Sequence, residues 1–121
     1  MRREACVALF AALIAIAPQL MAAERKPARV YNGAIAYHRA SSSYGYAVDR
    51  TTARDAQVEA LRQCRHPECE VVVRLRNNCG AVANGPQRFF TGTGATRQEA
   101  ETKAMRACGK ACELAAWACT R

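Results

Sequence analysis

The fold of this chain is decided by two copies of one stretch, Thr52-Ala-Arg-Asp-Ala-Gln-Val-Glu-Ala-Leu-Arg-Gln-Cys64 and Thr96-Arg-Gln-Glu-Ala-Glu-Thr-Lys-Ala-Met-Arg-Ala-Cys108. Each copy opens with a threonine that is followed three residues later by an acidic residue, which is the pattern of a helix capping box. Alanines and the final cysteine then recur at helical spacing, so each copy predicts a helix with a face of small residues. Such a face lets a helix lie close to a sheet. The chain therefore carries an internal repeat.

Strand-like segments flank each predicted helix. Around the first helix they are residues 31–37, 44–48 and 70–76, and around the second they are residues 80–83, 89–92 and 114–119. Gly33 and Gly45 mark positions where another backbone or a ring approaches a strand closely. Each copy thus has the order strand, strand, helix, strand. Two such units predict an α+β domain with a mainly antiparallel sheet, helices on one face and disulfide cross-links.

The N-terminal residues have the pattern of an export signal. Arg2 and Arg3 precede an apolar run at residues 7–17, and small residues follow at Ala22 and Ala23. The run is shorter than the roughly 20 apolar residues that a membrane-spanning helix needs. We expect a signal peptide at residues 1–23 that is cleaved, an uncleaved anchor being the alternative. The remaining chain is then a flexible lead-in at 24–30 and one domain at 31–121, without a transmembrane anchor, in the periplasm or outside the cell.

The chain of 121 residues is basic, with a net charge of +8. The charge falls by one, to +7, when Arg2, Arg3 and Glu4 leave with the signal peptide. This charge favours anionic partners such as acidic lipid headgroups, envelope polymers, nucleic acid or an acidic protein. It does not choose among them.

Six of the seven cysteines lie beyond the signal: Cys64, Cys69, Cys79, Cys108, Cys112 and Cys119. An even number in a small exported chain predicts disulfide bonds. Of the fifteen pairings that six cysteines allow, the repeat favours Cys64–Cys69, Cys108–Cys112 and Cys79–Cys119. The last bridge is expected to tie the two copies together. The alternative is a zinc site built from thiolates, but such sites usually have closer cysteine pairs. No metal and no cofactor is expected.

Several motifs keep a common order and spacing between residues 31 and 120: Gly33-Ala-Ile-Ala-Tyr37, Cys69-Glu-Val-Val-Val73, Asn78-Cys-Gly-Ala81, Gly94-Ala-Thr-Arg-Gln-Glu-Ala100 and Trp117-Ala-Cys119. Together they resemble a bacterial secreted family catalogued as domain of unknown function 4189. The resemblance implies export and a compact, cysteine-bridged domain. It transfers no catalytic residue to this chain.

The candidates for catalysis are His38 and His66, the two histidines of the sequence. A small basic ribonuclease uses an acid and a base on either side of a phosphate, and Arg39 and Glu68 lie near these histidines in the sequence. Both histidines are expected in solvent-exposed turns, however. No nucleophile elbow, zinc-protease motif or phosphate-binding loop is present in the sequence. Whether the chain is an enzyme is therefore left open, and the sequence favours that it is not.

The candidates for binding are aromatic and basic residues on the predicted strands: Tyr37, Arg39, Tyr44, Tyr46, Arg74 and Arg76. Tyrosines beside arginines are able to stack on bases or sugars above a basic surface. Trp117 is expected in the core.

These observations favour an exported, non-catalytic binding module whose partner is a protein or an anionic envelope component. An inhibitor or an immunity-like protein is one form of this function. A small exported hydrolase of the ribonuclease type, using His38 and His66, is the alternative. A third interpretation is nonspecific binding to polyanions, nucleic acid included, whose affinity falls steeply with salt.

Overall fold

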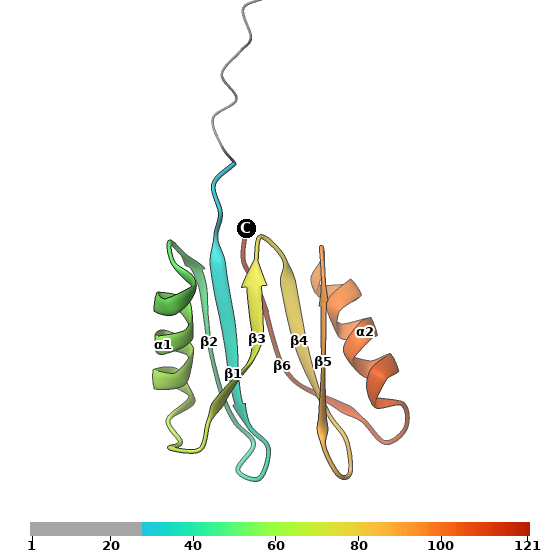
Figure 1. Ribbon diagram of the computed structural model, residues 1–121. Helices are drawn as coiled ribbons and strands as arrows, with labels where there is room; N and C mark the ends of the chain where they lie inside the picture. Colours follow the sequence, from blue (N-terminus) through green and yellow to red (C-terminus); the bar gives the residue numbers. More distant parts are fainter. Residues whose placement is uncertain (1–27) are drawn as a thin grey trace, which may run out of the picture.

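The computed structural model describes residues 28–121, and the predicted signal peptide lies outside them. The elements are β1 (Asn32–His38), β2 (Ser43–Arg50), α1 (Ala53–Cys64), β3 (Glu70–Arg76), β4 (Cys79–Asn84), β5 (Phe89–Gly94), α2 (Arg97–Cys108) and β6 (Glu113–Cys119) (Figure 1). The order strand, strand, helix, strand therefore occurs twice, as the repeat predicts. None of the helices within residues 28–121 has the length and apolar character needed to cross a membrane.

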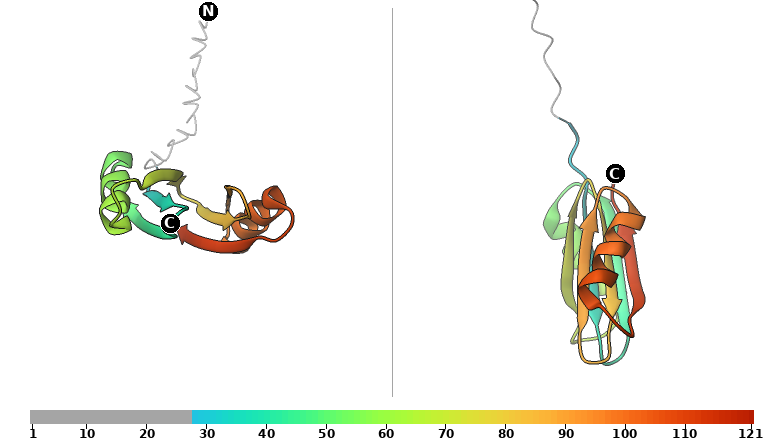
Figure 2. Two further views of the ribbon diagram at one scale, coloured as in Figure 1. Left: turned by 90° about the horizontal axis from the view of Figure 1, so that it is seen from below. Right: turned by 90° about the vertical axis from the view of Figure 1, so that its right-hand side faces the viewer.

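Each unit forms its own antiparallel sheet around its first strand. The strand order is β2-β1-β3 in the first sheet and β5-β4-β6 in the second. The sequence indicated one mainly antiparallel sheet, whereas the structure has two that face each other. Seen from below, α1 and α2 lie at opposite ends of the molecule with the two sheets between them (Figure 2). The α+β prediction is confirmed, and the layers follow the order helix, sheet, sheet, helix.

The interior consists of three apolar clusters, one at each boundary between layers. Between the sheets lie Ile35, Tyr37, Val73, Leu75, Val82, Ala116 and Ala118. Between α1 and its sheet the buried residues are five alanines and Cys64, and between α2 and its sheet they are four alanines and Cys79. The helix boundaries are thus built from small side chains. The helices consequently lie against the backbone of the sheets.

The helix termini have the capping contacts that the repeat predicts. Thr52 Oγ1 accepts a hydrogen bond from the Asp55 backbone N–H (3.1 Å), and Thr96 Oγ1 accepts one from the Glu99 backbone N–H (3.2 Å). Glu99 Oε2 also accepts from the backbone N–H of Ala95, the residue before the N-cap (3.2 Å). The two helices therefore begin at equivalent points of the two units.

Within residues 28–121 the structure contains three disulfides, Cys64–Cys69, Cys79–Cys119 and Cys108–Cys112, which are the pairs that the repeat predicts. The expectation that Cys79–Cys119 ties the two copies together is wrong, because the two cysteines are paired across β4 and β6 of the same sheet. In the first unit the equivalent cross-strand pair is Asn32 and Arg76. All three bridges therefore lie within single units.

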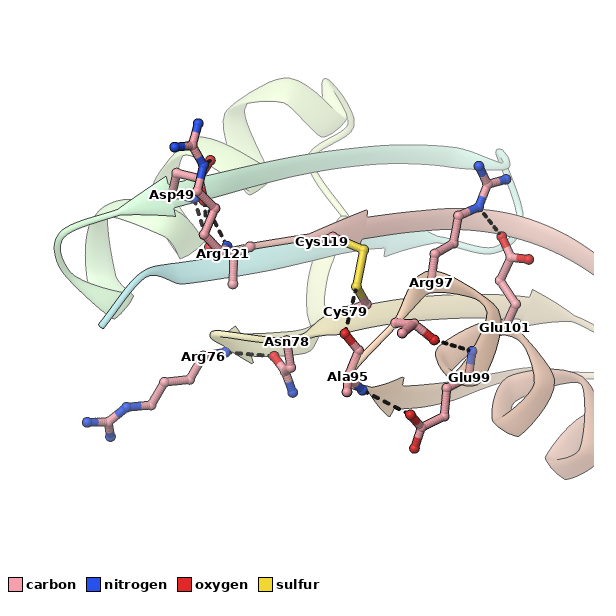
Figure 3. Close-up of a disulfide and its surroundings, with 12 residues drawn as sticks. Asp49, Arg76, Asn78, Cys79, Ala95, Arg97, Glu99, Glu101, Cys119 and Arg121 are labelled. Atoms are coloured by element: carbon pink, nitrogen blue, oxygen red, sulfur yellow. Dashed lines mark hydrogen bonds and ion pairs between the residues drawn. A yellow bond between two sulfur atoms is a disulfide. The ribbon is translucent and has the colours of Figure 1, made fainter. Parts of the chain in front are cut away.

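The two units are held together by noncovalent contacts in addition to the shared core. At one end of the sheets, the Arg39 guanidinium donates to Asn84 Oδ1 (3.0 Å) and to the Gly85 carbonyl (2.9 Å). At the other end, the Asp49 carboxylate accepts from the Thr120 hydroxyl (3.1 Å) and from the Arg121 backbone N–H (3.0 Å). Figure 3 shows Asp49 and Arg121 facing each other near the Cys79–Cys119 bridge.

The Asp49 contact predicts a stability that depends on pH. The hydrogen bond from the Arg121 backbone is the largest cause that holds the pKa of the Asp49 carboxyl below its usual value of 3.8. Because the folded-state pKa is the lower one, ionised Asp49 stabilises the fold above the usual pKa. This stabilisation is lost as the pH falls through the folded-state pKa.

We expect Asp49→Asn to be less stable than the unmodified chain at pH 7 and to lose less stability on acidification below about pH 4. Denaturant unfolding at pH 7 and pH 3 measures both differences. The variant still loses some stability at low pH, because hydrogen bonds also lower the pKa values of Glu59 and Glu99. Equal losses of stability in the two proteins would contradict this role of Asp49.

Candidate functional site

A groove of about 560 Å³ runs along the neighbouring edge strands β2 and β6. Tyr44 and Tyr46 of β2 line one side of it, and Leu114 and Trp117 of β6 line the other. Gly45 and Ala47 face α1, so the alternation along β2 directs the two tyrosines away from the helix. We call these four side chains, together with Arg97 and Glu101 of α2, the aromatic groove.

The side chains of the aromatic groove are unusually exposed for their type. Among residues 28–121, large hydrophobic side chains are exposed at seven positions, and four of these positions line the groove. Their exposed fractions lie between 42% and 49%. Exposed apolar side chains that gather in one place indicate an interaction surface, whereas single ones are normal.

Arg97 is fixed in place at the α2 side of the groove. Its guanidinium carbon lies 3.8 Å from the centroid of the Trp117 ring, which is a cation–π contact. Its Nε lies 2.6 Å from Glu101 Oε1, one turn further along the helix (Figure 3). The groove therefore presents an oriented positive group beside an exposed aromatic ring.

The structure places only some of the binding candidates from the sequence in the aromatic groove. Tyr44 and Tyr46 lie in the groove, but Tyr37 is only 3% exposed and packs edge-on against Phe89 in the core. Burial also raises the pKa of the Tyr37 hydroxyl. Arg39 forms the hydrogen bonds to the second unit that are described above. Tyr37 and Arg39 thus support the fold and lie outside the groove.

Arg74 and Arg76 are exposed on β3, which lies close to β4 and β5 of the other sheet. By the repeat, Arg74 of β3 occupies the position of Trp117 in β6. In the same way, the strand pairings place Phe89 of β5 at the position of Tyr44 and Thr91 at the position of Tyr46. The side of the molecule that corresponds to the aromatic groove thus has Thr91 and Arg74 in place of Tyr46 and Trp117, while Phe89 packs against Tyr37. We call it the polar side.

The two histidines proposed for catalysis come together at the end of β1 and the end of α1. Their ring centroids are 4.0 Å apart and the ring planes differ by 13°. The ribonuclease mechanism needs its acid and base on opposite sides of a phosphate, and two stacked rings leave no space for a phosphate between them. The geometry therefore disfavours that mechanism, although it places both histidines beside Glu68.

Sequence reasoning missed Trp117, Leu114, Arg97 and Glu101. Trp117, which was expected in the core, is 42% exposed. The alternation of Trp117 with buried Ala116 and Ala118 does indicate that it faces away from the other sheet. Its exposure also depends on α2, which lies mainly over β4 and β5 and leaves β6 partly uncovered. The position of α2 over the sheet depends on tertiary packing, so the sequence alone does not indicate it.

With the fold and the groove described, comparison with known proteins gives the family. A sequence profile described as "Domain of unknown function (DUF4189)" matches residues 32–119. The chain belongs to this family. The resemblance that the sequence motifs indicate is thereby confirmed.

This DUF4189 chain has mycobacterial relatives. It is 39% identical over 93 residues to the uncharacterized proteins Rv1813c of Mycobacterium tuberculosis and Mb1843c of Mycobacterium bovis. These alignments cover 77% of this chain and 63% of each relative, so the chain spans less than two thirds of their length. The NMR structure of Rv1813c is similar to the DUF4189 chain with a TM-score of 0.59 at 30% identity, covering 98% of this chain and 99% of that one.

Proposed function

We propose that this DUF4189 chain is an exported, non-catalytic binding module that contacts a partner protein through the aromatic groove. The observation that carries the proposal is the gathering of Tyr44, Tyr46, Leu114 and Trp117 in one groove while they remain about half exposed. Tyrosine, tryptophan and arginine are the residues most enriched at protein interfaces and among those that dominate binding energy. An inhibitor or immunity-like protein is one form that such a module takes.

The internal repeat supports a binding role for these aromatic residues. The polar side of the molecule has Thr91 and Arg74 at the positions of Tyr46 and Trp117, and the two sheets have the same strand order. The fold therefore does not need an aromatic residue at position 46 or at position 117. Exposed aromatic residues lower the solubility of a protein. Where the fold does not require them, binding to a partner explains their presence.

The groove and the charge together indicate the chemistry of the partner. The tyrosines and Trp117 suit an apolar or aromatic side chain inserted between the two edge strands. Arg97, held against Trp117 and half exposed, suits a carboxylate beside that side chain. The net charge of +7 that remains without residues 1–23 favours fast association with an acidic surface. The expected partner is thus a protein with an apolar side chain surrounded by acidic residues.

Export is part of the proposal and is supported by two features. The signal-like pattern of residues 1–23 is one. The other is the set of three disulfides, since such bonds persist in oxidising compartments such as the periplasm and the cell exterior. The partner is therefore expected among envelope or extracellular proteins.

Trp117→Ala is expected to weaken binding of the partner protein by at least about tenfold, because it removes the largest exposed ring of the groove. The matched control is Arg74→Ala at the equivalent position of the first unit, which should change affinity less than about threefold. The partner is first isolated from envelope and culture extracts with the oxidised chain at high salt. Isothermal titration calorimetry then measures the affinity of the purified partner for the unmodified chain and for each of the two variants.

Two results would overturn this proposal. One is a partner whose affinity is reduced by Arg74→Ala and unchanged by Trp117→Ala, which would place binding on the polar side. The other is retention of polyanions alone, released by salt to the same extent from every variant. That outcome would leave charge as the determinant and favour the nonspecific interpretation.

A further inference from the structure

His38, His66 and Glu68 form a compact cluster that the proposed binding role does not use. One ligand-type atom from each residue lies within 4.8 Å of the other two. His38 Nε2 and Glu68 Oε2 are 3.2 Å apart. The cluster borders a pocket of about 580 Å³ that is also lined by Glu70 and Phe89. It lies outside the aromatic groove.

Contacts with the turn that follows β1 fix the orientation of the His38 ring. Ser41 Oγ donates to Ser43 Oγ (2.9 Å) and accepts from the Ser43 backbone N–H (3.3 Å). The 2.6 Å contact between Ser41 Oγ and His38 Nδ1 holds the imidazole ring in this orientation. The other ring nitrogen, Nε2, faces the Glu68 carboxylate.

The 3.2 Å separation of His38 Nε2 and Glu68 Oε2 allows the two atoms to share one cation. That cation is either the proton of a charged imidazole or a metal ion. Two ligands of one tetrahedral zinc ion, each bound at about 2.0–2.1 Å, are about 3.3 Å apart. The separation of the two atoms thus fits a shared metal ion.

We propose that His38, His66 and Glu68 bind a divalent transition-metal ion such as Zn²⁺. Two imidazoles and one carboxylate are a donor set that zinc accepts, with a further position open to water or a ligand. Ser41 acts as the outer partner that orients His38, in the way that hydrogen-bonded histidines are held at metal sites. Glu68, whose side chain is 75% exposed, completes the site from the solvent side.

One side chain has to move when the ion binds. The imidazole rings are nearly parallel, whereas the lone pair of each nitrogen lies in the plane of its ring. A single ion therefore reaches both rings only after His66 turns out of the stack. That turn breaks the hydrogen bond that the Glu68 backbone N–H donates to His66 Nδ1 (3.0 Å), and this nitrogen becomes available to the ion.

The second unit shows that the fold does not require the cluster. Its corresponding loop, closed by Cys108–Cys112, contains Gly109, Lys110 and Ala111, and Gly85 stands at the position of His38. In the first unit, Cys64–Cys69 closes the loop that carries His66 and Glu68. This bridge limits the freedom of the two residues and so lowers the entropy that metal binding costs.

The experiment is a calorimetric titration of Zn²⁺ into the oxidised chain at pH 7, with any free thiol alkylated so that Cys6 cannot bind the ion. We expect one zinc ion per chain. His38→Ala and Glu68→Gln should each weaken binding at least about tenfold. Glu70→Gln, which removes a charge from the same pocket outside the cluster, should leave the affinity within about threefold. Lowering the pH to 5 should weaken binding, because protons compete for the imidazoles.

Nuclear magnetic resonance of the histidine rings gives the second readout. Zinc should shift the ring signals of both His38 and His66, since both are ligands. Absence of heat and of ring shifts at millimolar zinc would overturn the proposal. So would a Glu68→Gln variant that keeps the unmodified affinity, or equal weakening by Glu70→Gln, which would indicate binding by general negative charge. Glu68 is exposed, so its replacement tests the site without depending on a core residue.

Discussion

Replacing Cys79 and Cys119 together with alanine is expected to lower the free energy of unfolding by about 4 kcal/mol. The bridge closes a loop with a sequence separation of 40 residues, and in the chain-entropy model a longer loop restricts the unfolded chain more strongly. Small domains have a total stability of about 5–15 kcal/mol. This one bridge thus provides a large share, and denaturant unfolding of the oxidised proteins measures it.

The matched control is the double replacement of Cys64 and Cys69, whose sequence separation is 5. The same model gives about 2 kcal/mol for this short loop. Native contacts of β4 and β6 remain in the first variant, because the two strands are neighbours in one sheet. If both double variants lose the same stability, loop length is not the cause of the stabilisation.

Gly45→Ala and Gly92→Ala are each expected to cost about 3 kcal/mol, at the upper end of the cost of overpacking. A Cβ atom on Gly45 would lie 2.3 Å from the Ala60 carbonyl oxygen and from the Cys64 backbone nitrogen. On Gly92 it would lie 2.5 Å from the Ala100 oxygen and the Ala104 nitrogen. The neighbours are helix backbone, so each helix has to move away from its sheet.

Thr93→Ala is the control for Gly92→Ala, because Thr93 is exposed and is the next residue of the same strand. It should cost less than about 1 kcal/mol. Thermal or denaturant unfolding compares the variants, and the near-ultraviolet circular dichroism reports the packing. If the Gly92→Ala protein is as stable as the Thr93→Ala protein, α2 moves away from its sheet without a loss of stability.

Much of the secondary structure could be predicted because its determinants are local. The two capping boxes, the alanine spacing and the short apolar segments all lie within a few residues of the elements that they specify. Gly45 is an example of a residue whose role was readable, since a glycine inside a strand indicates a close approach. The cysteine pairs were predictable for a different reason, because the repeat places them at equivalent ends of the helices.

The candidate sites were less predictable, since each combines residues from distant parts of the chain. Tyr44 and Trp117 meet because β2 of one unit lies beside β6 of the other. His38 and His66 meet because the end of β1 lies beside the loop after α1. The sequence identified both histidines and both groove tyrosines as candidates. It could not indicate that Tyr37, which was a candidate together with Tyr44 and Tyr46, points into the core.

The sequence by itself determined the repeat, the order of the elements, the cysteine pairs and the membership of the DUF4189 family. Only the tertiary structure decided that the chain forms two facing sheets, that the long disulfide lies within one of them, and which aromatic residues stay exposed. The physical reason is that local hydrogen bonding and side-chain spacing specify an element. The face that an element buries depends on which element of the other unit packs against it.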